Sequence, residues 1–202
     1  MSSIVGHALA GAAVASTLAG GTAKGKRTTL LALAALLALA PDLDVLIYMA
    51  FRPLGMTPHR GITHTVVFAA LAGVPLALGL RRFVGLNYLR AFCICFGVWL
   101  SHSLLDFLMG AGPPVPFFWP YARDGYLLSF RLVPTAYYGL TSDALLAVLV
   151  SPATVVGAVL EVVIFTPLVM LSRGRDAASR LRLTLVSSGG LLLTVAIYNG
   201  WL

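Results

Sequence analysis

Long apolar stretches dominate this chain and leave it few ways to fold other than as a bundle of membrane-spanning helices. A helix needs about 20 mostly apolar residues to cross the hydrocarbon core. Charged residues make up only 10% of the 202 residues, whereas a soluble domain carries about 25%. The sequence therefore predicts an all-α, polytopic integral membrane helical bundle with about six membrane segments, of which the first and third are short enough to be tilted or re-entrant. The candidate segments are 4–20, 29–50, 63–80, 91–109, 144–171 and 183–201.

The connection 110–143 is long and rich in Gly, Pro and aromatic residues, including the run Gly112–Pro120. Proline interrupts helices, and Trp and Tyr suit a membrane–water interface. We therefore expect an interfacial Pro/aromatic loop within a single transmembrane helical domain, 1–202. No basic residue precedes the first apolar stretch, so we expect no cleaved signal peptide and keep His7 in the mature chain.

The basic residues predict the orientation of the bundle. Alternate connections hold ten of the 14 lysines and arginines, and the other connections hold the remaining four. The positive-inside rule places the ten-residue set in the cytoplasm and both termini outside. This distribution also explains the net charge of +7 without nucleic-acid binding. The ten are Lys24, Lys26, Arg27, Arg81, Arg82, Arg90, Arg173, Arg175, Arg180 and Arg182; the four are Arg52, Arg60, Arg123 and Arg131.

Three short polar clusters interrupt the apolar stretches. They are Pro41–Asp44, His59–His64 and His102–Asp106, and with His7 they contain every histidine and three of the seven acidic residues. Ionisable groups within a membrane are costly, so such clusters are a functional-site hypothesis. On the predicted topology all of them come to the outer side of the membrane. Apart from Arg60, the charge count did not use the residues of these clusters, and their agreement supports one shared site.

The spacing within each cluster leaves alternatives open. His102 and Asp106 are four apart and share a helix face, either as metal ligands or as a hydrogen-bonded pair. Asp42 and Asp44 would point apart in a regular helix, but an unwound segment at Pro41 could turn both inward; otherwise they are solvated carboxylates at an interfacial turn.

The cluster His59–His64 combines its two histidines with two other polar residues. Thr63 is expected to cap the following helix. Arg60 suits a phosphate or carboxylate oxygen, or acts as an interfacial anchor. Glu161, inside the fifth segment, receives no role.

Together these side chains predict a metal site. Neutral imidazole and carboxylate fit Zn²⁺ or Mn²⁺ better than Cu(I) or an iron–sulfur cluster, and there are enough ligands for one or two ions. Cys93 and Cys95 are expected to be ordinary buried residues. The predicted metal ligands are His7, Asp42, Asp44, His59, His64, His102 and Asp106.

The motifs Pro-Asp-Leu-Asp at 41–44, His-Arg-Gly-Ile-Thr-His-Thr at 59–65 and His-Ser-Leu-Leu-Asp at 102–106 resemble the YdjM family of membrane-bound, metal-dependent hydrolases of bacteria and archaea. The resemblance runs from His7 to Trp119-Pro120. It implies a polytopic helical protein in the inner (cell) membrane of a prokaryote. The metal residues that it implies are His7, Asp42, Asp44, His59 or His64, His102 and Asp106. The order of the ligands also resembles that of zinc-dependent phospholipases C, although the spacing differs.

We therefore expect a membrane-embedded metal-dependent hydrolase that cleaves a phosphoester of a lipid or lipid-linked substrate with a metal-activated water. Asp42 and Asp106 are the expected catalytic carboxylates, and Arg60 is expected to hold the phosphoryl group. Membrane lipids are the expected partners, with the site on the extracytoplasmic side.

Two other functions fit the same residues. A divalent-cation or proton transporter also places His and Asp in a membrane, with ligands spread across its depth. A non-catalytic scaffold would use a structural metal with a closed set of four protein ligands.

Overall fold

The computed structural model of this chain describes residues 3–45, 47, 59–134, 151–171 and 176–201. Within these residues, extended structure is limited to one isolated antiparallel bridge, Val115 to Tyr126, so the predicted all-α bundle is confirmed. The helices are α1 (Ile4–Leu18), α2 (Lys24–Leu37), α4 (Val66–Val84), α5 (Tyr88–Leu108), α7 (Pro152–Leu171) and α8 (Ala177–Tyr198), with 3-10 turns η1 (Ala40–Asp42) and η2 (Ile62–His64).

Five helical segments of the described chain are long and apolar enough to cross a membrane, and α1 is a shorter apolar helix. The second segment begins at Lys24 and not at residue 29, because long basic side chains extend along a helix to the polar interface. The third continues to Val84 and is long enough to cross a membrane, so it is longer than the predicted segment 63–80 allowed; whether it is tilted or re-entrant stays a prediction. Residues 144–150 of the fifth predicted segment lie outside the described residues.

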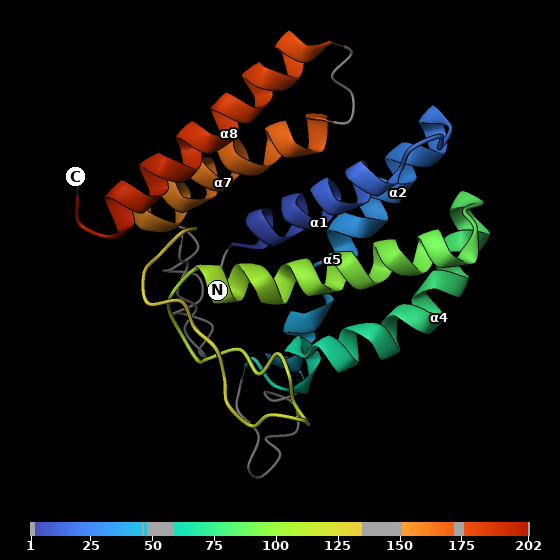
Figure 1. Ribbon diagram of the computed structural model, residues 1–202, viewed down its shortest axis with the longest axis horizontal. Helices are drawn as coiled ribbons and strands as arrows, with labels where there is room; N and C mark the ends of the chain where they lie inside the picture. Colours follow the sequence, from blue (N-terminus) through green and yellow to red (C-terminus); the bar gives the residue numbers. More distant parts are fainter. Residues whose placement is uncertain (1–2, 46, 48–58, 135–150, 172–175, 202) are drawn as a thin grey trace.

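Helix α5 is the centre of the bundle and contacts α1, α2, α4 and both 3-10 turns. The antiparallel α7–α8 hairpin lies along α1, on the other side from α4 (Figure 1). The hairpin between α4 and α5 is tight, because Gly85 ends α4 at φ +78° and the side chain of Asn87 caps the first turn of α5. The N-terminal end of α1 and the C-terminal end of α5 lie together (Figure 1).

Small residues let α1 approach its neighbours closely. A Cβ on Gly11 would lie 2.5 Å from Cβ of Ala38 and 2.9 Å from the carbonyl oxygen of Ala34, distances that no real Cβ contact shows. Helices in lipid gain little from the hydrophobic effect and associate through such close packing. The core between α1, α2, α4 and α5 is accordingly rich in alanine: Ala15, Ala19, Leu30, Ala34, Ala38, Ala77, Leu80, Val84, Ala91, Ile94, Cys95 and Val98.

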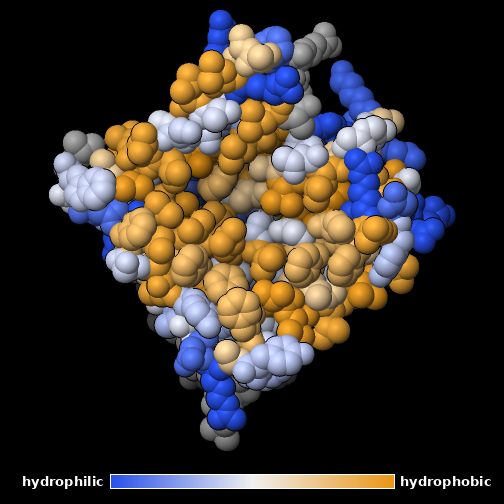
Figure 2. Space-filling model, in the orientation of Figure 1, coloured by the Kyte–Doolittle hydropathy of each residue, from blue (hydrophilic) through white to orange (hydrophobic). Residues whose placement is uncertain are grey.

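The outer surface of the bundle is apolar. Figure 2 shows hydrophobic residues across the middle of one face and hydrophilic residues toward its edges. Large apolar side chains such as Leu71, Phe83 and Leu192 are exposed, which suits contact with lipid tails. Cys95 is buried but Cys93 is exposed, so the expectation that both are buried is wrong for Cys93.

Residues 110–134 form the described part of the predicted interfacial loop. The loop is irregular, and the amide of Val66 donates to the carbonyl of Phe117 at 2.9 Å, which ties it to the start of α4. Its aromatic side chains Phe118, Trp119 and Tyr121 are exposed. Residues 135–143 of the predicted loop lie outside the described residues.

Candidate metal centre

His102 and Asp106 lie one turn apart on α5, so both side chains leave the same face of the helix. Both are fully buried. Nδ1 of His102 lies 2.7 Å from the carbonyl oxygen of Ala38. Because a carbonyl can only accept, Nδ1 is the donor, so Nε2 is the ring atom that could offer a lone pair to a metal. Nε2 faces the carboxylates of Asp42 and Asp106, which is the orientation that a metal-binding imidazole needs.

Asp42 and Asp44 reach the same region because the chain is irregular near Pro41. Helix α2 ends at Leu37, and the 3-10 turn η1 carries Asp42. Oδ1 of Asp42 lies 3.1 Å from Nε2 of His102 and 3.7 Å from Nε2 of His64. Asp44 instead faces the segment 59–64. The two carboxylates therefore take different positions around the cluster.

The segment 59–64 wraps around the carboxylate of Asp44. Asp44 accepts hydrogen bonds from the amide of Gly61 at 3.3 Å and the hydroxyl of Thr63 at 3.2 Å. Nδ1 of His59 lies 3.3 Å away and Nδ1 of His64 lies 3.4 Å away. With both Nδ1 atoms toward Asp44, the Nε2 atoms turn toward Asp106, at 3.6 Å for His59 and 3.4 Å for His64.

Two further contacts hold this segment. The indole N–H of Trp99 donates to the carbonyl of Thr63 at 2.7 Å. Thr65, and not the expected Thr63, caps α4, because its hydroxyl accepts from the amide of Phe68 at 3.0 Å. Trp99 was missed by the sequence reasoning, although it stands three residues before His102 and so shares its helix face. The carbonyl of Ala38 carries no side-chain signal that could have revealed it.

Arg60 is buried, and the protein itself engages its guanidinium. Nε donates to Oδ2 of Asp106 at 3.0 Å. Nη1 donates to the carbonyls of Ala111, at 2.9 Å, and Pro113, and Nη2 contacts Sδ of Met109. Arg60 has φ +62°, a left-handed conformation that is uncommon for a bulky residue. These contacts favour a role in fixing Asp106.

His7 comes from the first turns of α1 and stacks on His102, with the ring centroids 3.8 Å apart. Its Nε2 lies 3.7 Å from Oδ1 of Asp106. Among the described residues, neither ring nitrogen of His7 has a hydrogen-bond partner. His7 thus differs from the other three histidines, whose Nδ1 atoms all face an oxygen.

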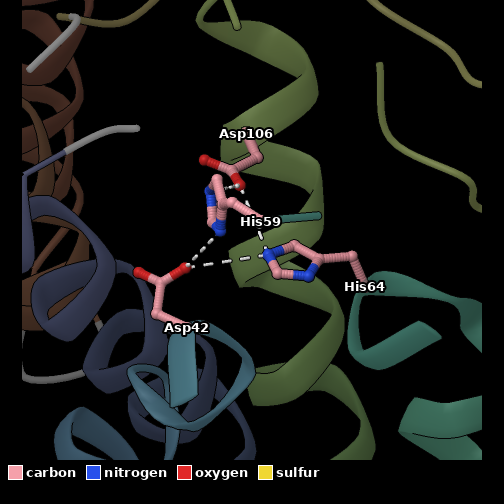
Figure 3. Close-up of side chains that lie close together, drawn as sticks. All are labelled: Asp42, His59, His64 and Asp106. Carbon is pink, nitrogen blue, oxygen red and sulfur yellow. Dashed lines mark ion pairs between the residues drawn. The ribbon is translucent and has the colours of Figure 1, made fainter. Parts of the chain in front are cut away.

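The structure brings all seven predicted metal residues together, and six of them form two groups. Asp42, His59, His64 and Asp106 can each offer an atom to one ion, and His7, His102 and Asp106 to a second. Figure 3 shows the first group pointing toward a common centre. Asp106 belongs to both groups, while Asp44 belongs to neither and lies behind His59 and His64.

Buried atoms without hydrogen bonds mark the same centre. Buried polar atoms in proteins nearly always have a partner, so each exception needs an explanation. Seven such exceptions in the described chain lie on the ligand side chains. They are both ring nitrogens of His7, Oδ1 of Asp42, Nε2 of His59, His64 and His102, and Oδ1 of Asp106. These groups are able to hold a metal ion, which would satisfy the atoms that the protein leaves unbonded.

The carboxylates around the segment 59–64 create a negative field that also favours a bound cation. Burial alone would lower the pKa of His64, but the carboxylates of Asp106, Asp42 and Asp44 outweigh it and raise the pKa to about 10. Burial also acts to lower the pKa of His59, and hydrogen bonds to Asp106 and Asp44 raise it overall. The same negative field would attract a divalent cation.

Comparison with known proteins gives the family. The profile of a family described as YdjM inner membrane protein matches residues 1–177. The chain belongs to the YdjM family. The match confirms the predicted resemblance and extends it well beyond Trp119-Pro120. No solved structure matches the chain.

A curated relative of this YdjM family member is the inner membrane protein YbcI of Escherichia coli (strain K12). The two are 30% identical over 107 residues, which are 52% of this chain and 62% of the relative. The match thus spans less than two thirds of the relative's length. Together with the apolar helices, these similarities show an integral inner membrane protein.

Proposed function

We propose that this protein is a membrane-embedded metal-dependent hydrolase that cleaves a phosphoester of a lipid or lipid-linked substrate. The observation that carries the proposal is the pair of ligand groups joined by Asp106. Two-metal sites with ions about 3.5–4 Å apart recur in phosphatases and nucleases. A shared carboxylate is the arrangement that brings two ions so close.

The donor set fits Zn²⁺ or Mn²⁺. Imidazole nitrogen and carboxylate oxygen are ligands of both ions. Bound there, such ions would lower the pKa of a water molecule to about 7 and polarise the phosphoryl oxygen. His59, His64 and Asp42 would hold one ion, His7 and His102 the other, and Asp106 both.

The exposure of the carboxylates separates their roles. The side chain of Asp42 is 19% exposed, whereas that of Asp106 is fully buried. This difference supports a role for Asp42 in meeting the substrate and in accepting a proton from the water that a bound ion would activate. It supports a role for Asp106, held by Arg60 and enclosed by the four imidazoles, in fixing the ligand geometry.

In our proposal, Arg60 and Asp44 hold the metal ligands in position. The hydrogen bonds of Arg60 to Asp106 and to the carbonyls of Ala111 and Pro113 favour orienting Asp106 over holding a phosphoryl group. Asp44 fixes the Nδ1 side of His59 and His64, as carboxylates behind metal-binding histidines commonly do. Phosphoryl binding by Arg60 and metal binding by Asp44 stay predictions of the sequence.

The charge of the loaded centre suits a phosphoester. Two divalent ions and Arg60 would outweigh the carboxylates of Asp42, Asp44 and Asp106, so the centre would be positive. The exposed aromatic residues of 110–134 lie on the chain that Arg60 binds and suit a lipid interface. Both features support an anionic, amphiphilic substrate.

The positions of the basic residues support an extracytoplasmic site. Lys24 and Arg27 stand at the start of the segment that ends near Asp42, and Arg90 stands at the start of α5, which ends near Asp106. The basic residues thus lie at the opposite ends of the helices that carry the ligands. By the positive-inside rule those ends are cytoplasmic.

The test is metal content and hydrolysis of the detergent-purified protein. We expect the wild type to contain bound zinc or manganese. In mixed micelles it should release phosphate from phosphatidate, or the phosphoalcohol from phosphatidylcholine. Both the metal and the hydrolysis should be lost in His102→Ala. A metal-loaded protein that transports zinc into proteoliposomes and hydrolyses neither lipid would favour the transporter. A tightly bound ion with no hydrolysis and no transport would favour the scaffold.

A further inference from the structure

Glu161 is a buried carboxylate in the middle of α7 that the proposed hydrolase does not use. It is fully buried and lies in a strongly apolar helix. An ionisable group is costly there unless hydrogen bonds satisfy it. Glu161 has such bonds: the amide of Ser3 donates to Oε1 at 2.9 Å, and the hydroxyl of Ser3 donates to Oε2.

Ser3 is the residue on which the first turn of α1 is built. It is the N-cap, and its hydroxyl also accepts from the amide of Gly6 at 3.2 Å. Its carbonyl accepts from the amide of His7 at 3.1 Å. A carboxylate at a helix N-terminus is further favoured by the helix dipole. Glu161 therefore anchors the turn that carries His7.

The position of the His7 ring depends on the placement of its helix, whereas the other three histidine rings each face an oxygen atom that holds them. Asp44 faces the rings of His59 and His64, and the carbonyl of Ala38 faces that of His102. The ring of His7 has no such partner among the described residues and rests on His102 by stacking. The position of α1 therefore sets the position of its ring.

We infer that Glu161 is a positioning residue that places His7 at the metal centre through Ser3. The described part of the α7–α8 hairpin supplies no ligand to either group, yet α7 packs along α1. Glu161 gives this hairpin a part in metal binding. The inference rests on the proposed metal centre, since its consequence is the occupancy of the group His7, His102 and Asp106.

The experiment compares Glu161→Ala and Glu161→Gln with the wild type in metal content after dialysis against a weak chelator. We expect Glu161→Ala to hold about one ion fewer, because the group containing His7 loses its geometry while the other group stays intact. Glutamine can still accept from the amide of Ser3 and donate to its hydroxyl, so Glu161→Gln should restore most of the loss. Asp176→Ala, an exposed acid in the same hairpin, is the matched control and should bind as the wild type does.

Hydrogen–deuterium exchange of the metal-free proteins separates this inference from the proposed function. We expect faster exchange in residues 3–9 of Glu161→Ala and much less change in Glu161→Gln. If the wild type holds no metal, the proposed function fails while the exchange still decides whether the anchor exists. Unchanged metal content and exchange in Glu161→Ala would overturn the inference, as would a glutamine variant as defective as the alanine variant.

If Glu161→Ala fails to fold, Ser3→Ala tests the same contact. Ser3→Ala removes the hydroxyl bond to Glu161 and the cap on the amide of Gly6 but leaves the amide bond to Glu161. It should therefore show a smaller loss of the same ion than Glu161→Ala, together with faster exchange in residues 3–9. Wild-type behaviour of Ser3→Ala in both measurements would count against the anchor.

Discussion

The two ligand groups are built in different ways although they share Asp106. In the group of Asp42, His59 and His64, the segment that carries both histidines is held by hydrogen bonds of Asp44 to His59, to the amide of Gly61 and to the hydroxyl of Thr63. The group of His7 and His102 depends on how α1 packs against α5. One position is thus fixed by local hydrogen bonds and the other by helix packing. The comparison teaches that the two should fail under different perturbations.

Removing the shared carboxylate of Asp106 should disable both ligand groups at once. Asp106→Asn leaves a side chain of the same size that binds cations poorly, so we expect loss of both ions and hydrolysis at the background rate. Elemental analysis and the lipid assay measure this. Asp124→Asn, an exposed acid of the loop, is the control. Retention of either ion in Asp106→Asn would contradict the shared role.

Disturbing the helix packing should remove only the group that contains His7. A valine at Gly11 would collide with Ala38 and Ala34 and push α1 away. We expect a loss of about 1–3 kcal/mol in stability and of about one metal ion. Thermal unfolding and metal content check both. Gly25→Ala, where nothing lies within 4 Å of the added Cβ, should change neither strongly.

Disturbing the hydrogen bonds should weaken only the other group. Asp44→Asn keeps the size of the side chain but cannot accept from all of its present donors. We expect the affinity of the ion held by His59 and His64 to fall about 10–100-fold. Competition with a chromophoric chelator measures this affinity. An equal loss of the ion held by His7 would show that the two groups are not built separately.

A smaller effect is expected from pH, again on the group with His64. In the folded, metal-free protein the pKa of His64 is raised to about 10 from its usual 6.5. Protonation therefore stabilises the metal-free fold fully below pH 6.5, and this contribution is lost as the pH rises toward 10. We expect the melting temperature of the protein freed of metal by a chelator to fall between pH 6.5 and 10. Over the same range the affinity for zinc should rise, because His64 loses its proton. A melting temperature independent of pH there would contradict this.

The sequence predicted what side chains alone can reveal. The apolar runs indicated the spanning helices, and the rarity of His and Asp in such runs indicated the seven residues that the structure gathers. The spacing of His102 and Asp106 predicted their shared face. The irregular chain at Pro41 was likewise foreseen.

What the sequence did not reveal depends on backbone geometry or on distant partners. The carbonyl of Ala38 has no side-chain signature, and the pairing of Ser3 with Glu161 joins residues 158 positions apart. The hydrogen bonds of Arg60 to Asp106 and to the carbonyls of Ala111 and Pro113 were not predicted, because its charge is visible in the sequence while its partners are not. The contacts of Asp44 with Gly61 and Thr63 were hidden for the same reason.

The position of Asp106 in both ligand groups makes metal loading a linked equilibrium. Whatever factor the first ion applies to the affinity of the second, the second must apply to the first. Attraction to an already neutralised carboxylate is weaker than to a free one, so that factor should oppose loading. A half-loaded protein would then dominate over a range of free metal concentration, and the activity would follow the second binding step alone.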